Sequence, residues 1–187
     1  MRTSHWLLVA TLGTLLGGCA TTRNLSDEDR KKISVVRIDR NVLKPTPMTF
    51  RGPGTDAKAL QEFAEKNGIF IEKIAFQEID AAILESGILK VSDSEEATGA
   101  IITIAVHVYG FSIPHGFSSD LVPIVAIGCR MVDSTGKVIW VTSDSVLPLR
   151  NPVEPMSLEA MREDPKRIED AWRKASRQIA RNIAKTL

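Results

Sequence analysis

The first 19 residues limit what the rest of the chain has to fold. Arg2 gives a short positively charged start, and an almost uninterrupted apolar stretch runs from Trp6 to Leu16. A helix that spans a bilayer needs about 20 apolar residues, so this stretch is too short to span and has the length of the apolar region of a secretory signal peptide. We therefore expect residues 1–18 to be a signal peptide that takes no part in the fold.

The expected signal peptide ends with Leu16, Gly17 and Gly18, which Cys19 follows. This run resembles the bacterial lipobox, in which signal peptidase II cuts before a cysteine that already carries a diacylglycerol. The resemblance implies that Leu16, Gly17 and Gly18 are the peptidase recognition residues and that Cys19 carries the lipid, with no other cofactor. Ala20 stands where an Asp would signal retention in the inner membrane, which implies the periplasmic face of the outer membrane. The alternative is a core Gly-Gly-Cys segment at the end of a buried helix.

Charge and cysteine content exclude several classes of function. The chain has 24 Lys and Arg against 23 Asp and Glu, and loss of Arg2 with the signal peptide leaves the two signs balanced. A neutral domain has no single-sign field to draw it to nucleic acid or to anionic lipid, so only the acyl chains would hold it at the membrane. With Cys19 acylated, Cys129 is left alone. Its apolar, β-rich surroundings favour a buried inert thiol over a reactive or intermolecularly bonded one.

Apolar periodicity predicts one α/β domain over residues 33–187, and a polar tether is expected over residues 19–32. The lipobox resemblance implies that the tether is lipidated and that the domain is periplasmic. Asp133-Ser134-Thr135-Gly136 predicts the tight turn of an antiparallel hairpin. The expected fold class is α/β (α+β), with a single mixed sheet of about 4–5 strands packed by a central helix and a C-terminal helix. The expected strands are 33–38, 88–91, 100–111, 121–132 and 137–145, and the expected helices are 55–84, divided at Asn67-Gly68, and the segment that follows Asp164-Pro165.

The C-terminal helix has one apolar face, which predicts that Trp172 is a core residue rather than a ligand platform. Its other face carries Arg173, Lys174, Arg177, Arg181 and Lys185. We expect a solvated face there, and the alternative is a weak contact with the membrane or with glycan phosphates.

The hairpin segment Met131-Val132-Asp133-Ser134-Thr135-Gly136-Lys137-Val138-Ile139-Trp140, behind a lipobox, resembles the mixed α/β periplasmic lipoproteins grouped around the curli secretion channel and penicillin-binding-protein activators. The similarity covers the hairpin closely and the rest of the domain loosely. It implies a non-enzymatic accessory lipoprotein that binds proteins in envelope assembly, secretion or cell-wall maintenance. The alternative is a structural subunit of an oligomeric envelope or secretion ring. No long amphipathic segment is available for a transmembrane β-hairpin, so a pore is not expected.

Few residues are available for catalysis or metal binding. Once His5 leaves with the signal peptide, only His107 and His115 remain, and they match no recognised zinc spacing. Ser, His and Asp lie close together between residues 112 and 120, but catalytic triads form by geometry across a fold, and there is no Gly-x-Ser-x-Gly elbow. We expect no catalytic residues and no metal, and a periplasmic hydrolase is the least favoured function.

The segment from Tyr109 to Asp120 is the best candidate for binding a periplasmic or outer-membrane protein. Tyr109, Phe111, His115, Phe117 and Asp120 lie between two strong strands, with Gly and Pro among them. The alternative is a plain connection in which Phe111 and Phe117 pack into the core. The connection over residues 40–55 is a second candidate surface.

Overall fold

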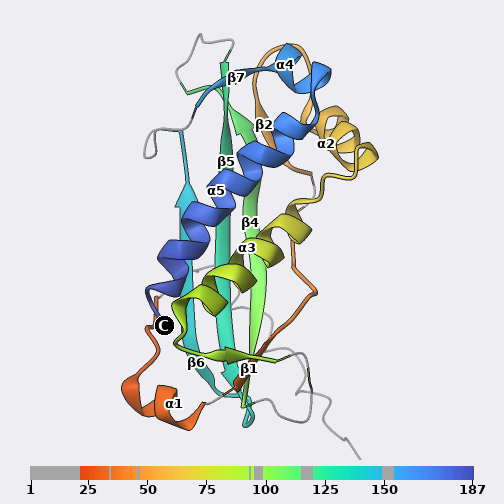
Figure 1. The fold of residues 1–187 in the computed structure, drawn as a ribbon. Helices are drawn as coiled ribbons and strands as arrows, with labels where there is room; N and C mark the ends of the chain where they lie inside the picture. Colours follow the sequence, from red (N-terminus) through yellow and green to blue (C-terminus); the bar gives the residue numbers. More distant parts are fainter. Residues whose placement is uncertain are drawn as a thin grey trace, which may run out of the picture.

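The computed structural model describes residues 22–33, 35–45, 47–92, 94, 99–114, 120–148 and 154–187. In that part of the chain, two long helices cover one face of a mixed seven-stranded sheet, which confirms the expected α/β fold (Figure 1). The strands are β1 (Val35–Ile38), β2 (Thr49–Arg51), β3 (Lys90–Val91), β4 (Ala100–Ser112), β5 (Asp120–Asp133), β6 (Val138–Val146) and β7 (Met156–Ser157). The helices are α1 (Asp27–Lys32), α2 (Ala57–Lys66), α3 (Ile71–Ser86), α4 (Leu158–Glu163) and α5 (Lys166–Ala184). The expected recognition residues and Cys19 lie outside the described residues.

The sheet is built around the two longest strands. β4 and β5 run antiparallel, and β5 also pairs antiparallel with β6. β1 joins β4 in parallel and β3 joins β1, so the strand order is β3-β1-β4-β5-β6 and β6 lies at an edge. The short strands β2 and β7 pair with the far ends of β4 and β5, and they make the sheet larger than the expected 4–5 strands.

The turn between β5 and β6 confirms the predicted hairpin. Asp133 Oδ1 accepts hydrogen bonds from the backbone N–H of Thr135 at 2.9 Å and of Lys137 at 3.0 Å, and from the Thr135 hydroxyl at 2.6 Å. The Thr135 hydroxyl and these N–H groups lower the pKa of the Asp133 carboxyl below its usual value. Gly136 takes a φ of 85°, which a residue without Cβ adopts at no steric cost.

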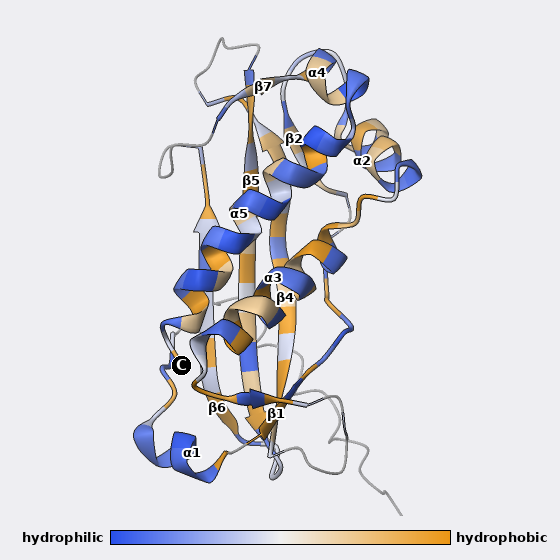
Figure 2. Cartoon of the chain, in the orientation of Figure 1, coloured by the Kyte–Doolittle hydropathy of each residue, from blue (hydrophilic) through white to orange (hydrophobic). Residues whose placement is uncertain are grey.

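Helices α3 and α5 lie side by side on the sheet and close the core. In Figure 2 the side of the α5 ribbon that faces away from the sheet is coloured hydrophilic, and the buried residues of α5 are mainly apolar. Trp172 of α5 is 1% exposed and donates a hydrogen bond from Nε1 to the Gly110 carbonyl oxygen at 3.3 Å. Its ring stacks on Phe111 at 5.7 Å and meets Tyr109 edge-on at 5.6 Å. The prediction that Trp172 is a core residue is therefore confirmed.

A register shift in β4 changes the position of two residues that the sequence suggested for partner binding. The pairing with β5 shifts between Val106 and Val108, so one extra residue is inserted and the strand's alternation of faces is reset. Tyr109 and Phe111 consequently point to the helix-covered face with Val106, and they are 2% and 0% exposed. The prediction that Tyr109 and Phe111 are exposed contact residues is wrong, whereas the alternative of a buried Phe111 is confirmed.

Candidate functional site

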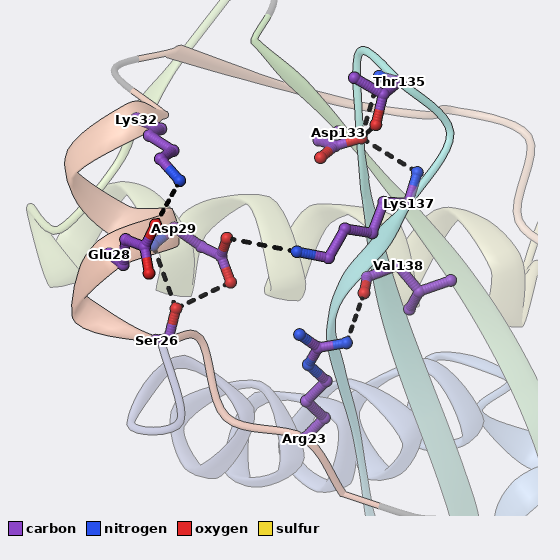
Figure 3. A network of polar contacts seen from close by, with 9 residues as sticks. All are labelled: Arg23, Ser26, Glu28, Asp29, Lys32, Asp133, Thr135, Lys137 and Val138. Atoms are coloured by element: carbon purple, nitrogen blue, oxygen red, sulfur yellow. Dashed lines mark hydrogen bonds and ion pairs between the residues drawn. The ribbon is translucent and has the colours of Figure 1, made fainter.

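Residues 22–33, the described residues that precede the first strand, are held against the rest of the domain. Arg23 and Val141 of β6 exchange backbone hydrogen bonds, Arg23 N to Val141 O at 2.7 Å and Val141 N to Arg23 O at 3.0 Å. The Arg23 guanidinium also donates to the Val138 carbonyl oxygen at 2.8 Å (Figure 3). The segment therefore differs from the expected polar tether over residues 19–32, because backbone groups at the β6 edge pair with Arg23.

Helix α1 is held between this segment and the hairpin. The Ser26 hydroxyl caps the helix by accepting from Asp29 N at 3.1 Å, and Asp27 to Asp29 in the first turn and Arg30 to Lys32 in the last suit the helix dipole. Lys137 Nζ lies 4.0 Å from Asp29 Oδ1, so the helix contacts the β5–β6 turn. Figure 3 shows these polar groups converging on the hairpin.

The C-terminus completes this arrangement. Leu25, only 4% exposed, packs in the core and donates its backbone N–H to the Thr186 carbonyl oxygen at 3.4 Å. Burial of a leucine side chain contributes about 1.5–3 kcal/mol. Arg30 bonds to the carbonyl oxygen of Leu187, and Trp140 Nε1 donates to the Thr186 hydroxyl oxygen at 3.0 Å. We call Arg23, Leu25, Arg30, Val141 and Thr186 the N-terminal dock.

A pocket lies at the other end of the molecule, between β7 and the first half of α5. Its volume is about 210 Å³. Its lining combines carboxylates, basic groups and apolar side chains, a mixture that suits a peptide or protein surface carrying both signs of charge. The lining residues are Glu154, Pro155, Met156, Arg167, Asp170, Ala171 and Lys174. We call it the distal pocket.

Asp120, one of the five residues predicted to bind a partner, lies near the distal pocket. It is exposed at the start of β5 and pairs with Ser157 of β7, next to the pocket residue Met156. Tyr109 and Phe111 belong to the core, and His115 and Phe117 lie outside the described residues. The pocket itself was missed by sequence reasoning, because it combines a short strand with one face of a helix distant in sequence.

The basic face of α5 is not simply solvated. Arg173 Nη1 lies 3.1 Å from Glu78 Oε1 of α3, and Arg177 Nε lies 2.8 Å from Glu78 Oε2. Glu78 is 7% exposed, so two guanidinium groups compensate a buried carboxylate. Arg173 and Arg177 thus hold α5 against α3. The sequence pattern did not predict this contact, because it could not show that α3 carries an acid facing these arginines.

The connection over residues 40–55, the second candidate surface, is also tied to the domain. Lys44 Nζ lies 3.1 Å from Glu72 Oε2 and 3.3 Å from Glu65 Oε1. Burial lowers the pKa of Lys44, but the bonds with Glu72 and Glu65 outweigh it and the net pKa is raised. This arrangement is a structural ion-pair cluster that fixes the connection against α2 and α3.

The described residues contain neither a membrane-spanning helix nor a cluster of metal-binding side chains. None of their helices has the length and apolar character needed to cross a bilayer. Within the same residues, no group of three or more His, Cys, Asp and Glu is arranged to hold a metal ion.

Comparison with known proteins finds similarity in structure alone. No protein-family model matches the chain, and no curated sequence is significantly similar to it. A Xanthomonas campestris protein of the DUF330 family is similar with a TM-score of 0.50 and 11% identity, over 82% of this chain and 85% of that one. A PelC dodecamer from Paraburkholderia phytofirmans has a TM-score of 0.45 and 11% identity, over 89% and 94%. A minor lipoprotein from Acinetobacter baumannii has a TM-score of 0.40 and 9% identity, over 81% and 93%. At these identities the similarity concerns the fold.

Proposed function

We propose that this chain is a lipid-anchored protein of the bacterial outer membrane, facing the periplasm, that acts by binding a protein partner and not by catalysis. The observation that carries the proposal is the N-terminal dock. It starts the folded domain four residues after the lipobox cysteine and leaves the distal pocket at the opposite end. This arrangement suits a module that is held at a membrane and presents its far end.

The distal pocket is the proposed contact surface. Met156 and Ala171 supply apolar area, while Asp170 and Lys174 supply charges of opposite sign within one turn of α5. Protein interfaces combine such an apolar centre with a polar rim. The family resemblance implies that the partner belongs to envelope assembly, secretion or cell-wall maintenance. Binding of this kind needs no cofactor.

Photo-crosslinking in intact cells tests the proposed surface. A photoreactive side chain replaces Asp170, which is exposed beside the pocket, and in a matched control it replaces Glu85, an exposed acid near the far end of α3. We expect a discrete adduct larger than the chain with the probe at residue 170 and none with the probe at residue 85. Equal capture at both positions, or capture only at residue 85, would contradict the proposal.

A structural subunit of an oligomeric ring is the second candidate, and the edge position of β6 favours it. Val141 directs its N–H and carbonyl out of the sheet toward Arg23, so Ser143, two residues further along, directs its own backbone groups outward as well. Among the described residues, β5 pairs with the inner edge of β6, and no strand pairs with its outer edge beyond Val141. Unpaired edges of this kind accept a strand from another chain.

A further inference from the structure

The lipid attachment is separated from the folded domain by very little chain. Only Ala20, Thr21 and Thr22 stand between Cys19 and the docked Arg23. Four Cα-to-Cα steps reach at most about 14 Å when fully extended. If Cys19 is acylated as proposed, this length limits how far Arg23 can lie from the bilayer surface.

The N-terminal dock keeps this connection short. Release of Arg23 would break the backbone bonds of 2.7 and 3.0 Å with Val141 and the 2.8 Å bond to Val138. Withdrawal of the next residues would also expose Leu25, which is 4% exposed in the fold. Detachment of Arg23 and Leu25 from the domain would lengthen the connection, but it is unfavourable because it loses several hydrogen bonds and the burial of a leucine.

Other parts of the domain lie much farther from Arg23 than the connection is long. Val141 pairs with Arg130 of β5. Asp120, at the start of the same strand, lies ten residues before Arg130, which is about 33 Å at the rise of a β-strand. At that far end, β2 is separated from β6 by β5 and β4, and α2 lies beyond β2 (Figure 1). Helix α2 is therefore displaced from Arg23 both along the strands and across the sheet.

Charge near the dock gives no independent pull toward lipid. Asp27 pairs with Arg30 at 3.6 Å, Glu28 with Lys32 at 2.6 Å and Asp29 with Lys137 at 4.0 Å. Since acids and bases compensate one another, the contact with the bilayer depends on the covalent connection and not on headgroup charge.

We infer that the N-terminal dock orients the domain on the membrane, so that the β6 edge around Arg23 lies against the lipid bilayer while α2 and the distal pocket face away from it. The membrane-facing surface is thereby the β6 edge with the β5–β6 turn. The surface available to a periplasmic partner is the opposite end.

Fluorescence quenching on vesicles tests this orientation. The lipidated full-length protein is reconstituted in phosphatidylcholine vesicles that contain a nitroxide-headgroup lipid. One fluorophore is attached to Ser143→Cys on β6 or to Lys58→Cys on α2, both exposed, while buried Cys129 stays unlabelled. We expect quenching at residue 143 to exceed quenching at residue 58 by about threefold or more, given their difference in reach. High salt leaves the ratio unchanged.

A linker insertion supplies the control. Fifteen Gly and Ser residues inserted between Thr21 and Thr22 add about 20 Å of flexible chain without altering the dock, so the ratio is expected to fall toward one. Equal quenching at both positions with the native connection would overturn the orientation while the lipid anchor stands. Failure of the native protein to float with the vesicles would instead refute the lipid anchor, and the orientation with it.

Discussion

At the scale of single residues, Cys129 shows how burial decides chemistry. It lies in the middle of β5, is 3% exposed, and pairs with Ile104 on one side and Thr142 on the other. Burial raises the pKa of its thiol to about 12, because the apolar surroundings disfavour the thiolate. The sequence predicted the burial of Cys129 correctly, since an apolar, β-rich run is seldom exposed.

A thiol titration checks the reactivity of Cys129. In a Cys19→Ala variant, Cys129 is the one remaining cysteine, and native protein at pH 8 should react with an aromatic disulfide reagent about a thousandfold more slowly than the urea-unfolded chain. The thiolate fraction, and with it the rate, should rise as pH approaches the raised pKa. A native rate within about tenfold of the unfolded rate would contradict the buried, protonated thiol.

At the scale of elements, patterns of local sequence predicted the long pieces, and tertiary contacts decided the short ones. β4, β5, the hairpin turn and α5 have their own periodicity or turn residues, and the structure agrees with them. β2 depends on Gly110, whose φ is 138° and whose missing Cβ leaves room for the Thr49 carbonyl oxygen. A close approach of two backbones distant in sequence has no periodic signal.

The errors of the sequence analysis have equally local causes. The shift between Val106 and Val108 turns Tyr109 to the helix-covered face, and a register shift of this kind has no signal in the local sequence. The segment 19–32 appeared to be a tether because of its charges. Its signals for structure were Ser26 as a helix cap and Leu25 as a lone apolar residue ready for burial. Prediction of the distal pocket would have required knowing which face of α5 lies beside β7.

A proline at the sheet edge separates the two candidate functions. Ser143→Pro removes an N–H that points away from β5, so the fold should tolerate it, whereas Thr142→Pro removes one that points toward β5 and should unfold the domain. We expect light scattering to give a monomer mass for residues 20–187, which lack the signal peptide and Cys19, with and without Ser143→Pro. An oligomer that Ser143→Pro disperses would favour the ring subunit and contradict the partner-binding account.

At the scale of the whole molecule, the N-terminal dock and the distal pocket lie at opposite ends and are proposed to have different roles. The end that carries the β5–β6 turn, α1 and the C-terminus is closed by the N-terminal dock, where paired charges and buried Leu25 leave little to bind. The other end carries the distal pocket beside β7. A lipid at Cys19 would place the first end at the bilayer and the second toward the periplasm, which unites the anchoring and partner-binding proposals in one geometry.

The mass of the N-terminal peptide tests the central claim most directly. The protein is purified in detergent from the membrane fraction and digested with trypsin, and the peptide that ends at Arg23 is weighed. The account predicts a peptide that begins at Cys19 and carries a diacylglycerol thioether, with or without an amide-linked acyl chain. A chain that begins at Met1 with an unmodified Cys19 would contradict the lipid anchor and the membrane orientation derived from it.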